Sequence, residues 1–237
     1  MLAFNVTRFS TSTYTQLNSF CSSATILADG KVLTAGGSGG FIGGRTSSTF
    51  MSGLYSPETN RTERQTSFDT ADARWYSTMI TLADGRPILL GGMVPYSEGY
   101  WPYTTSNNLA SLTPEVFTPG KGWSFLAGGY STEAFGMYRT RNEFPHAWVA
   151  PNGEVFGISS DVMWALNPAG SGSIRTVGTF KGGAVIGNGG AGGTRSLPNV
   201  GSSTTSAVMF APGKALQMGG NGYWVADGTH LWASSAS

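Results

Sequence analysis

Apolar residues alternate with small or polar residues in four short stretches of the chain, and a turn containing glycine divides each stretch. The turns are Asp29-Gly30, Asp84-Gly85, Asn152-Gly153 and Pro212-Gly213. Alternation with a period of two is typical of half-buried β-strands, and a turn between two such runs is typical of a β-hairpin. The pattern therefore predicts four β-hairpins. The first three turns are predicted to be two-residue turns in which both residues have positive φ.

Two further elements recur in a fixed order after the hairpins. The second strand of three hairpins ends in a glycine pair, and an aromatic or apolar pair followed by a proline turn comes later. The glycine pairs are Gly36-Gly37, Gly91-Gly92 and Gly219-Gly220. The proline turns are Leu54-Tyr55-Ser56-Pro57, Val116-Phe117-Thr118-Pro119 and Ala165-Leu166-Asn167-Pro168. This order is typical of the kelch repeat, which forms one four-stranded blade of a β-propeller.

The predicted fold class is therefore all-β: a kelch-type β-propeller domain over residues 1–237, with about four blades of an expected seven. An irregular β-sandwich is the alternative. Kelch propellers usually close with six or seven blades, and an open propeller exposes strand edges. We therefore expect a partial chain, which requires the missing remainder of the propeller or another copy of itself as a partner.

Composition narrows the class of partner. Charged residues make up 11% of the chain, against roughly 25% in average globular proteins, and the net charge is +1. This composition disfavours nucleic acids and anionic membranes as partners. No apolar stretch approaches the roughly 18 residues of a membrane span, and no signal peptide is visible. The single cysteine excludes an internal disulfide and a cysteine-based zinc site.

The most specific chemical signal is a cysteine and a tyrosine at the same position of two consecutive repeats. Cys21 and Tyr76 each lie nine residues before the turn glycine of their hairpin, Gly30 and Gly85. Equivalent positions of neighbouring propeller blades lie side by side, at the start of the strand that lines the central channel. The register therefore predicts that Cys21 and Tyr76 are close enough to react. A free cysteine buried as a small apolar residue is the alternative.

The residues around this pair resemble the galactose oxidase and glyoxal oxidase family of copper radical oxidases. The matching segments are Phe20-Cys21-Ser22 and Ala73-Arg74-Trp75-Tyr76-Ser77. The resemblance implies a secreted oxidase that converts a primary alcohol or aldehyde with O2 and releases H2O2. It also implies that Cys21 and Tyr76 are catalytic and form a thioether radical cofactor, with Tyr76 as a copper ligand.

The third repeat suggests a substrate contact. It contains Gly136-Met137-Tyr138-Arg139, and in the resembled family an arginine after Gly-x-Tyr contacts substrate hydroxyls. Arg139 is therefore the candidate substrate-binding residue, for a small alcohol, aldehyde or carbohydrate. A surface arginine without this role is the alternative.

The sequence departs from the family where further copper ligands are expected. The family uses a Tyr-His pair at the same repeat position of a later blade, but the equivalent residues here are Phe144 and Thr204. The two histidines, His146 and His230, lack metal-ligand spacing and are expected to be structural. Whether this chain is an enzyme therefore stays open, and we expect no activity from it alone. The alternative function is a non-catalytic kelch module that binds carbohydrate or protein.

A second departure concerns the aromatic residue that covers the thioether. Galactose oxidase has a tryptophan two residues after the second glycine pair, where this chain has Val94. This difference argues against galactose as substrate and favours the glyoxal-oxidase-like or broader branch of the family. Aromatic residues of the following segment are candidate substitutes, although a surface aromatic loop is the alternative. These residues are Tyr96, Tyr100, Trp101 and Tyr103.

Overall fold

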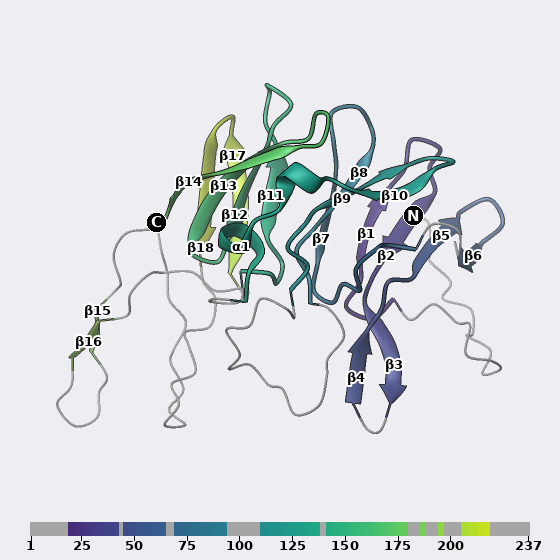
Figure 1. Cartoon of the computed structure of the whole chain (residues 1–237), viewed down its shortest axis with the longest axis horizontal. Coiled ribbons are helices and arrows are strands. Elements are labelled where there is room, and N and C mark those ends of the chain that lie inside the picture. The colour runs from purple at the N-terminus through teal and green to yellow at the C-terminus, as the bar shows by residue number, and fades with distance from the viewer. Residues whose placement is uncertain are drawn as a thin grey trace.

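The computed structural model shows a row of antiparallel β-sheets arranged like the blades of a propeller (Figure 1). It describes residues 19–42, 45–64, 69–93, 110–137, 141–179, 185–187, 194–196 and 205–218. The described part is nearly all strand, with one short α-helix, α1 (Thr132–Phe135), and one 3-10 turn, η3 (Ala127–Gly129). The predicted all-β fold class is therefore confirmed.

Three sheets have four strands each, and in each the strands lie in chain order. The first consists of β1 (Ser23–Ile26), β2 (Val32–Ala35), β5 (Ser52–Ser56) and β6 (Arg61–Arg64). The second consists of β7 (Thr78–Thr81), β8 (Pro87–Leu90), β9 (Glu115–Thr118) and β10 (Gly122–Phe125). The third consists of β11 (His146–Val149), β12 (Val155–Ser159), β13 (Val162–Asn167) and β14 (Ser173–Thr179).

The remaining described strands form two-stranded sheets. These are β3 (Ser38–Ile42) with β4 (Arg45–Ser48), β15 (Val185–Gly187) with β16 (Thr194–Ser196), and β17 (Ser206–Ala211) with β18 (Lys214–Met218). The β17–β18 pair is the fourth predicted hairpin. Gln217 connects it to the third sheet, because its Nε2 donates to the Ser160 carbonyl at 3.2 Å.

The first strands of successive sheets lie next to one another. β7 contacts β1 on one side and β11 on the other. Hydroxyl groups link the first pair: Ser23 Oγ and Ser77 Oγ lie 3.0 Å apart, and Thr25 Oγ1 and Thr81 Oγ1 lie 2.9 Å apart. Neighbouring innermost strands are a propeller feature, since the blades of a propeller meet at its axis.

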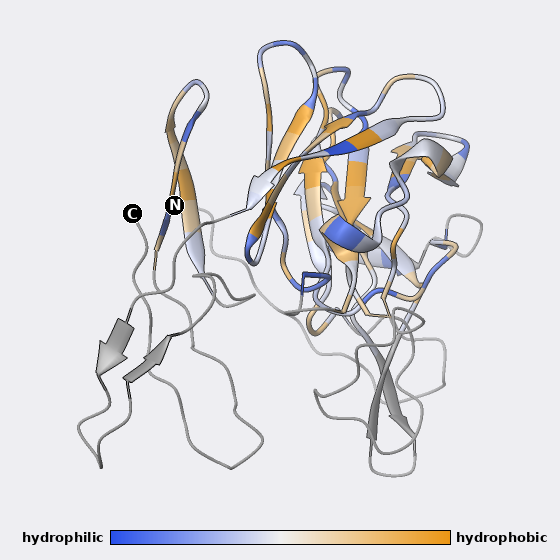
Figure 2. Cartoon of the chain, turned by 60° about the vertical axis from the view of Figure 1, so that its left-hand side comes forward, coloured by the Kyte–Doolittle hydropathy of each residue, from blue (hydrophilic) through white to orange (hydrophobic). Residues whose placement is uncertain are grey.

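Hydrophobic residues are concentrated on the strands of the neighbouring sheets (Figure 2), and buried apolar side chains pack between these sheets. The larger cluster joins the second and third sheets and includes Ile88, Leu90, Val155 and Trp164, all fully buried. A smaller cluster joins the first and second sheets and includes Leu33. These contacts fix the order and spacing of the blades, because burial of apolar surface is the main stabilising contribution to such packing.

The turns of the first three hairpins differ from the prediction. In the first, the Leu27 amide bonds to the Lys31 carbonyl, so the loop has three residues, and Gly30 has φ 80° whereas Asp29 has no positive φ. Asp29 is instead an acceptor, since its Oδ1 receives the Lys31 amide at 3.1 Å. The Asp84 and Asn152 turns repeat this arrangement. The two-residue prediction was wrong because the carboxylate or amide stabilises a type I turn followed by a left-handed glycine.

No described helix is long and apolar enough to cross a membrane.

Candidate functional site

Three residues at equivalent positions of the first three sheets have a left-handed backbone. These are Cys21 (φ 62°), Tyr76 (φ 62°) and Phe144 (φ 44°). Each lies two residues before the first strand of its sheet. A left-handed residue other than glycine costs about 1–2 kcal/mol. Strain of this kind persists only where surrounding contacts enforce it, which occurs often at functional sites.

Backbone hydrogen bonds connect these three residues in sequence. The Tyr76 amide donates to the Cys21 carbonyl at 3.2 Å, and the Phe144 amide donates to the Tyr76 carbonyl at 2.8 Å. The rings of Tyr76 and Phe144 lie 4.5 Å apart between centroids. On the other side, Cys21 is a half-buried free cysteine whose side chain is in hydrogen-bonding reach of the Tyr76 hydroxyl. The structure therefore brings Cys21 and Tyr76 together, as their shared register predicts.

The environment of Tyr76 opposes ionisation of its phenol. Burial raises the pKa of Tyr76 to about 12, with further contributions from the Cys21 side chain and from the negative charge of Glu143. The phenol is therefore protonated at neutral pH. A bound cation is the kind of group that favours the phenolate, because an opposite charge close by lowers the pKa of an acid.

Trp75 covers Tyr76 and was missed by the sequence reasoning. The two rings are stacked with centroids 3.5 Å apart and an interplanar angle of 21°. Trp75 is fixed by two backbone hydrogen bonds to Met93, at 3.0 and 2.8 Å. Its buried Nε1 has no hydrogen-bond partner in the described part of the chain. The substitutes expected between Tyr96 and Tyr103 lie outside the described residues.

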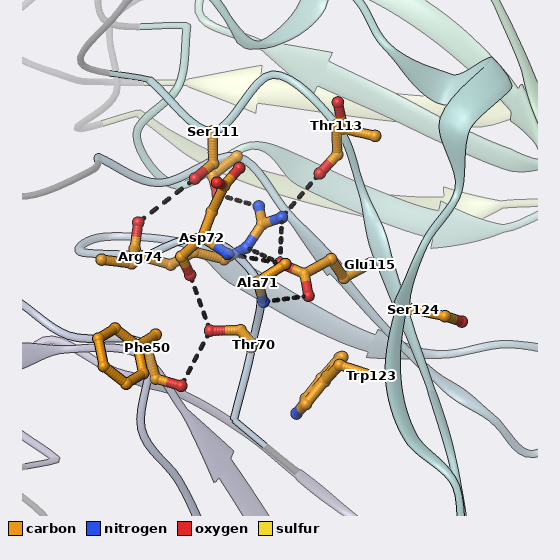
Figure 3. Close-up of polar contacts among 12 residues, drawn as sticks. Phe50, Thr70, Ala71, Asp72, Arg74, Ser111, Thr113, Glu115, Trp123 and Ser124 are labelled. Carbon is orange, nitrogen blue, oxygen red and sulfur yellow. Dashed lines mark hydrogen bonds and ion pairs between the residues drawn. The ribbon is translucent and has the colours of Figure 1, made fainter.

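The segment before Tyr76 is anchored by a buried ion pair (Figure 3). Arg74 and Glu115 both have fully buried side chains, and Arg74 Nη2 lies 2.8 Å from Glu115 Oε1. The Arg74 guanidinium also donates to the carbonyls of Gly91 and Thr113, both at 2.7 Å. Glu115 receives the Ala71 amide at 2.8 Å as well. The loop that carries Trp75 and Tyr76 is therefore tied to strand β9.

A groove of about 520 Å³ begins at Phe144 and runs between the innermost strands. Thr78, His146, Trp148 and Thr205 are among the residues that line it. His146 Nε2 lies 3.2 Å from Thr205 Oγ1. Burial lowers the pKa of His146, which makes its neutral form the dominant one at neutral pH. The groove thus combines aromatic surface with hydroxyl and imidazole groups.

The described residues fit a copper centre only in part. Tyr76 offers one oxygen ligand, whereas Phe144 at the next equivalent position has no ligand atom. Among the residues that the structure describes, no group of three or more His, Cys, Asp or Glu side chains is arranged to hold a metal. The candidate substrate-binding residue Arg139 lies outside the described part, and so do Thr204, expected not to be a ligand, and His230, expected to be structural. These expectations stay predictions.

Comparison with known proteins identifies the family. Residues 4–210 match the family model described as the glyoxal oxidase N-terminus. The chain belongs to this family. The resemblance inferred from the Cys21 and Tyr76 segments is thereby confirmed. No curated protein sequence matches the chain.

Solved structures support the fold of this glyoxal oxidase N-terminal domain. One is a novel fungal alcohol oxidase with catalytic diversity among the AA5 family, in complex with copper. It has a TM-score of 0.57 and 19% identity, and the match covers 87% of this chain and 36% of that chain. Another is YjhT, with a TM-score of 0.52 and 13% identity, covering 68% of this chain and 52% of that chain. The chain therefore spans about a third of the length of the fungal oxidase.

Proposed function

We propose that this chain supplies the cysteine–tyrosine part of a copper radical oxidase, which oxidises a primary alcohol or aldehyde with O2 and releases H2O2. The observation that carries the proposal is the contact between Cys21 and Tyr76 in a member of the glyoxal oxidase N-terminus family. We also propose that the protein is secreted, as the resemblance implies, and that Arg139 contacts the substrate.

The first step is the formation of a thioether between the two side chains. The Cys21 sulfur bonds to the Tyr76 ring carbon next to the hydroxyl, and one S–H and one ring C–H bond break. Two electrons and two protons pass to O2, which becomes H2O2. The proximity of Cys21 to the Tyr76 hydroxyl supports this step, because the reacting ring carbon is adjacent to that hydroxyl. Positioning two groups in contact makes such a reaction effectively unimolecular.

The second role of the chain is to control the phenol. Copper bound through the Tyr76 oxygen would supply one-electron redox chemistry and would favour the phenolate. A thioether substituent lowers the potential needed to oxidise the phenol. Trp75 covers one face of the ring at 3.5 Å and would shield an oxidised Tyr76 from water and reductants.

Further ligands must complete the copper site, since the described residues supply Tyr76 alone. We therefore expect no catalytic peroxide production from this chain by itself, beyond the single H2O2 released as each thioether forms. Thioether formation depends on Cys21 and Tyr76, whereas turnover requires a complete copper site.

Intact mass spectrometry tests the thioether. The chain is incubated with copper and O2, and the expected product is lighter than the reduced chain by the mass of two hydrogen atoms. Cys21→Ser and Tyr76→Phe are the controls, and neither is expected to lose this mass. An unchanged mass for the wild-type chain after full copper loading would contradict the proposal.

The alternative is a non-catalytic propeller module that binds carbohydrate. The groove between β7, β11 and β17 favours it, because Trp148, His146 and Thr205 combine an aromatic face with hydrogen-bonding groups. Titration with mono- and oligosaccharides, followed by tryptophan fluorescence, tests this function. Binding that is lost in Trp148→Ala, in a chain that forms no thioether, would support the alternative.

A further inference from the structure

We propose that Arg74, through its buried ion pair with Glu115, is a positioning residue that keeps Tyr76 in its left-handed conformation and its ring at Cys21. The inference deepens the proposed function, and it rests on that function only where thioether formation is the readout. Its structural consequence, the order of the Tyr76 segment, can be measured whether or not the thioether forms.

The backbone of Arg74 links the first sheet to this segment. Its amide donates to the Thr49 carbonyl at 3.0 Å, and its carbonyl accepts the Gly37 amide at 2.6 Å. The fit is close, because a side chain at Gly36 would place its Cβ 2.2 Å from the Arg74 carbonyl oxygen. Arg74 therefore has no room to shift toward the first sheet.

The side chain of Arg74 links the same point to the second sheet. Its guanidinium donates to Gly91 and Thr113 carbonyls and to the Glu115 carboxylate. A planar guanidinium with several donors in fixed directions resists rotation more than a flexible ammonium does. Arg74 is thus held from two sheets, two residues before Tyr76.

From Arg74 onward every backbone polar group through Tyr76 has a partner. Trp75 pairs in both directions with Met93, and Tyr76 pairs with Cys21 and Phe144. Three consecutive residues are therefore fixed by hydrogen bonds to separate segments. This arrangement can enforce the strained φ of 62° at Tyr76, because strained residues need surroundings that over-determine them.

The equivalent position of the next sheet offers an internal comparison. Asn142 lies two residues before Phe144, and its carbonyl accepts the Gly92 amide at 2.6 Å, as the Arg74 carbonyl accepts the Gly37 amide. The Asn142 side-chain amide, however, is buried without a hydrogen-bond partner in the described part of the chain. The repeat thus has a charged anchor before Tyr76, which can react, and none at the matching place before Phe144, which cannot.

Glu115→Gln is the principal test variant, because it removes the charge while keeping the size of the side chain. Asp161→Asn is the matched control, since Asp161, in the turn between β12 and β13, forms a second buried ion pair among the described residues, with Arg141 Nε 2.7 Å from its Oδ1. Both variants lose a buried carboxylate, so a loss of general stability affects both. Hydrogen exchange of the amides of Gly37 and Tyr76, and the thioether fraction after a fixed time with copper and O2, are measured in each.

In Glu115→Gln we expect the Gly37 and Tyr76 amides to exchange at least about tenfold faster than in Asp161→Asn. The reason is that the segment around Arg74 can then open by local unfolding, without unfolding of the whole domain. We expect a thioether fraction several-fold lower than in the control. Equal exchange and equal thioether fractions in the two variants would overturn the inference. If the wild-type chain forms no thioether, the proposed function fails, and the exchange of these amides still decides the positioning role.

A second variant covers the case in which Glu115→Gln does not fold. Arg74→Lys keeps the charge but removes the planar fork of donors. The same two amides are expected to exchange faster in Arg74→Lys than in Arg141→Lys, its control in the third sheet. Equal exchange at Gly37 and Tyr76 in the two lysine variants would refute the positioning role of Arg74.

Discussion

The amide of Tyr76 donates a hydrogen bond to the carbonyl of Cys21 at 3.2 Å, so the entry points of the first and second sheets are joined directly. Both residues have φ 62°, and both side chains therefore leave the backbone in the same way. This shared geometry places sulfur and phenol in contact although 54 residues lie between them in the chain. The repeat thus brings the cysteine and the tyrosine together by using one backbone conformation twice.

Because the pKa of Tyr76 is raised in the folded chain, the free energy of unfolding is expected to fall as the pH becomes alkaline. The folded state favours the protonated phenol, with a pKa of about 12 against an ordinary value of 10.0. Its contribution to stability is complete below pH 10.0 and is lost as pH rises toward about 12. Tyr76→Phe is therefore expected to lose less stability than the wild-type chain over this window. Urea unfolding at several alkaline pH values measures the free energy of unfolding of both proteins. The same dependence on pH in the wild-type chain and in Tyr76→Phe would contradict the prediction.

Trp75 is expected to protect an oxidised Tyr76. In Trp75→Leu the stacked indole is gone, so a tyrosyl radical should decay faster and should be harder to generate. Electron paramagnetic resonance of the chain with a formed thioether, after removal of copper and chemical oxidation, measures both the yield and the decay rate of the radical. Aromatic pairs contribute about 0.5–1.5 kcal/mol beyond buried area, so a stability loss is also expected.

Trp75→Phe is the control for this experiment, because it keeps an aromatic ring next to Tyr76 while removing Nε1. Its radical should decay at a rate between those of the wild-type chain and Trp75→Leu. A leucine variant whose radical lasts as long as that of the wild-type chain would show that the stack gives no protection.

Much of this site was predictable from the sequence because it follows from register. Turn glycines define the hairpins, and the hairpins place Cys21 and Tyr76 at equivalent points of adjacent sheets. The stack of Trp75 on Tyr76 was not predictable in this way. Neighbouring residues of an extended strand point to opposite faces. The left-handed backbone at Tyr76 breaks this rule, and the amino-acid sequence does not reveal that conformation.

The Arg74–Glu115 pair was also missed, for a different reason. Glu115 is the first residue of β9, whose sequence is Glu-Val-Phe-Thr, and its burial becomes visible only when the second sheet is assembled. A buried charge pair is recognised by partners that come from distant segments. Sequence periodicity reports the faces of one element and not these partners.

His146 is expected to make stability sensitive to acid. Burial lowers its pKa below the ordinary value of 6.5, so the unfolded chain binds a proton first as pH falls. Stability is therefore complete above pH 6.5 and is lost as pH drops through the lowered pKa of the folded state. His146→Gln should remove this loss, because glutamine can still reach Thr205 but does not titrate.

Thermal unfolding of the wild-type chain and His146→Gln, at mildly acidic and at neutral pH, checks this prediction. The unfolding temperature of the wild-type chain should fall more than that of His146→Gln when the pH is lowered from neutral to mildly acidic. A constant difference across the range would show that His146 does not titrate in this window. Thr205→Val is a useful companion, since it removes the hydroxyl partner and leaves the imidazole.

The chain directly after β2 approaches the backbone of Arg74 closely at Gly36. Gly36 has φ 74°, and a Cβ there would lie 2.2 Å from the Arg74 carbonyl oxygen, whereas Gly30 has φ 80° and open space around its Cβ position. Gly30→Ala should cost about 1–2 kcal/mol from backbone strain alone. Gly36→Ala adds a clash with backbone, for which about 1–3 kcal/mol more is expected. It should also displace Tyr76 from Cys21, so its thioether yield should fall while that of Gly30→Ala stays near the wild-type value. Urea unfolding measures the loss of stability, and intact mass measures the thioether yield. Equal losses of stability and of thioether yield in Gly36→Ala and Gly30→Ala would contradict the prediction of a clash at Gly36.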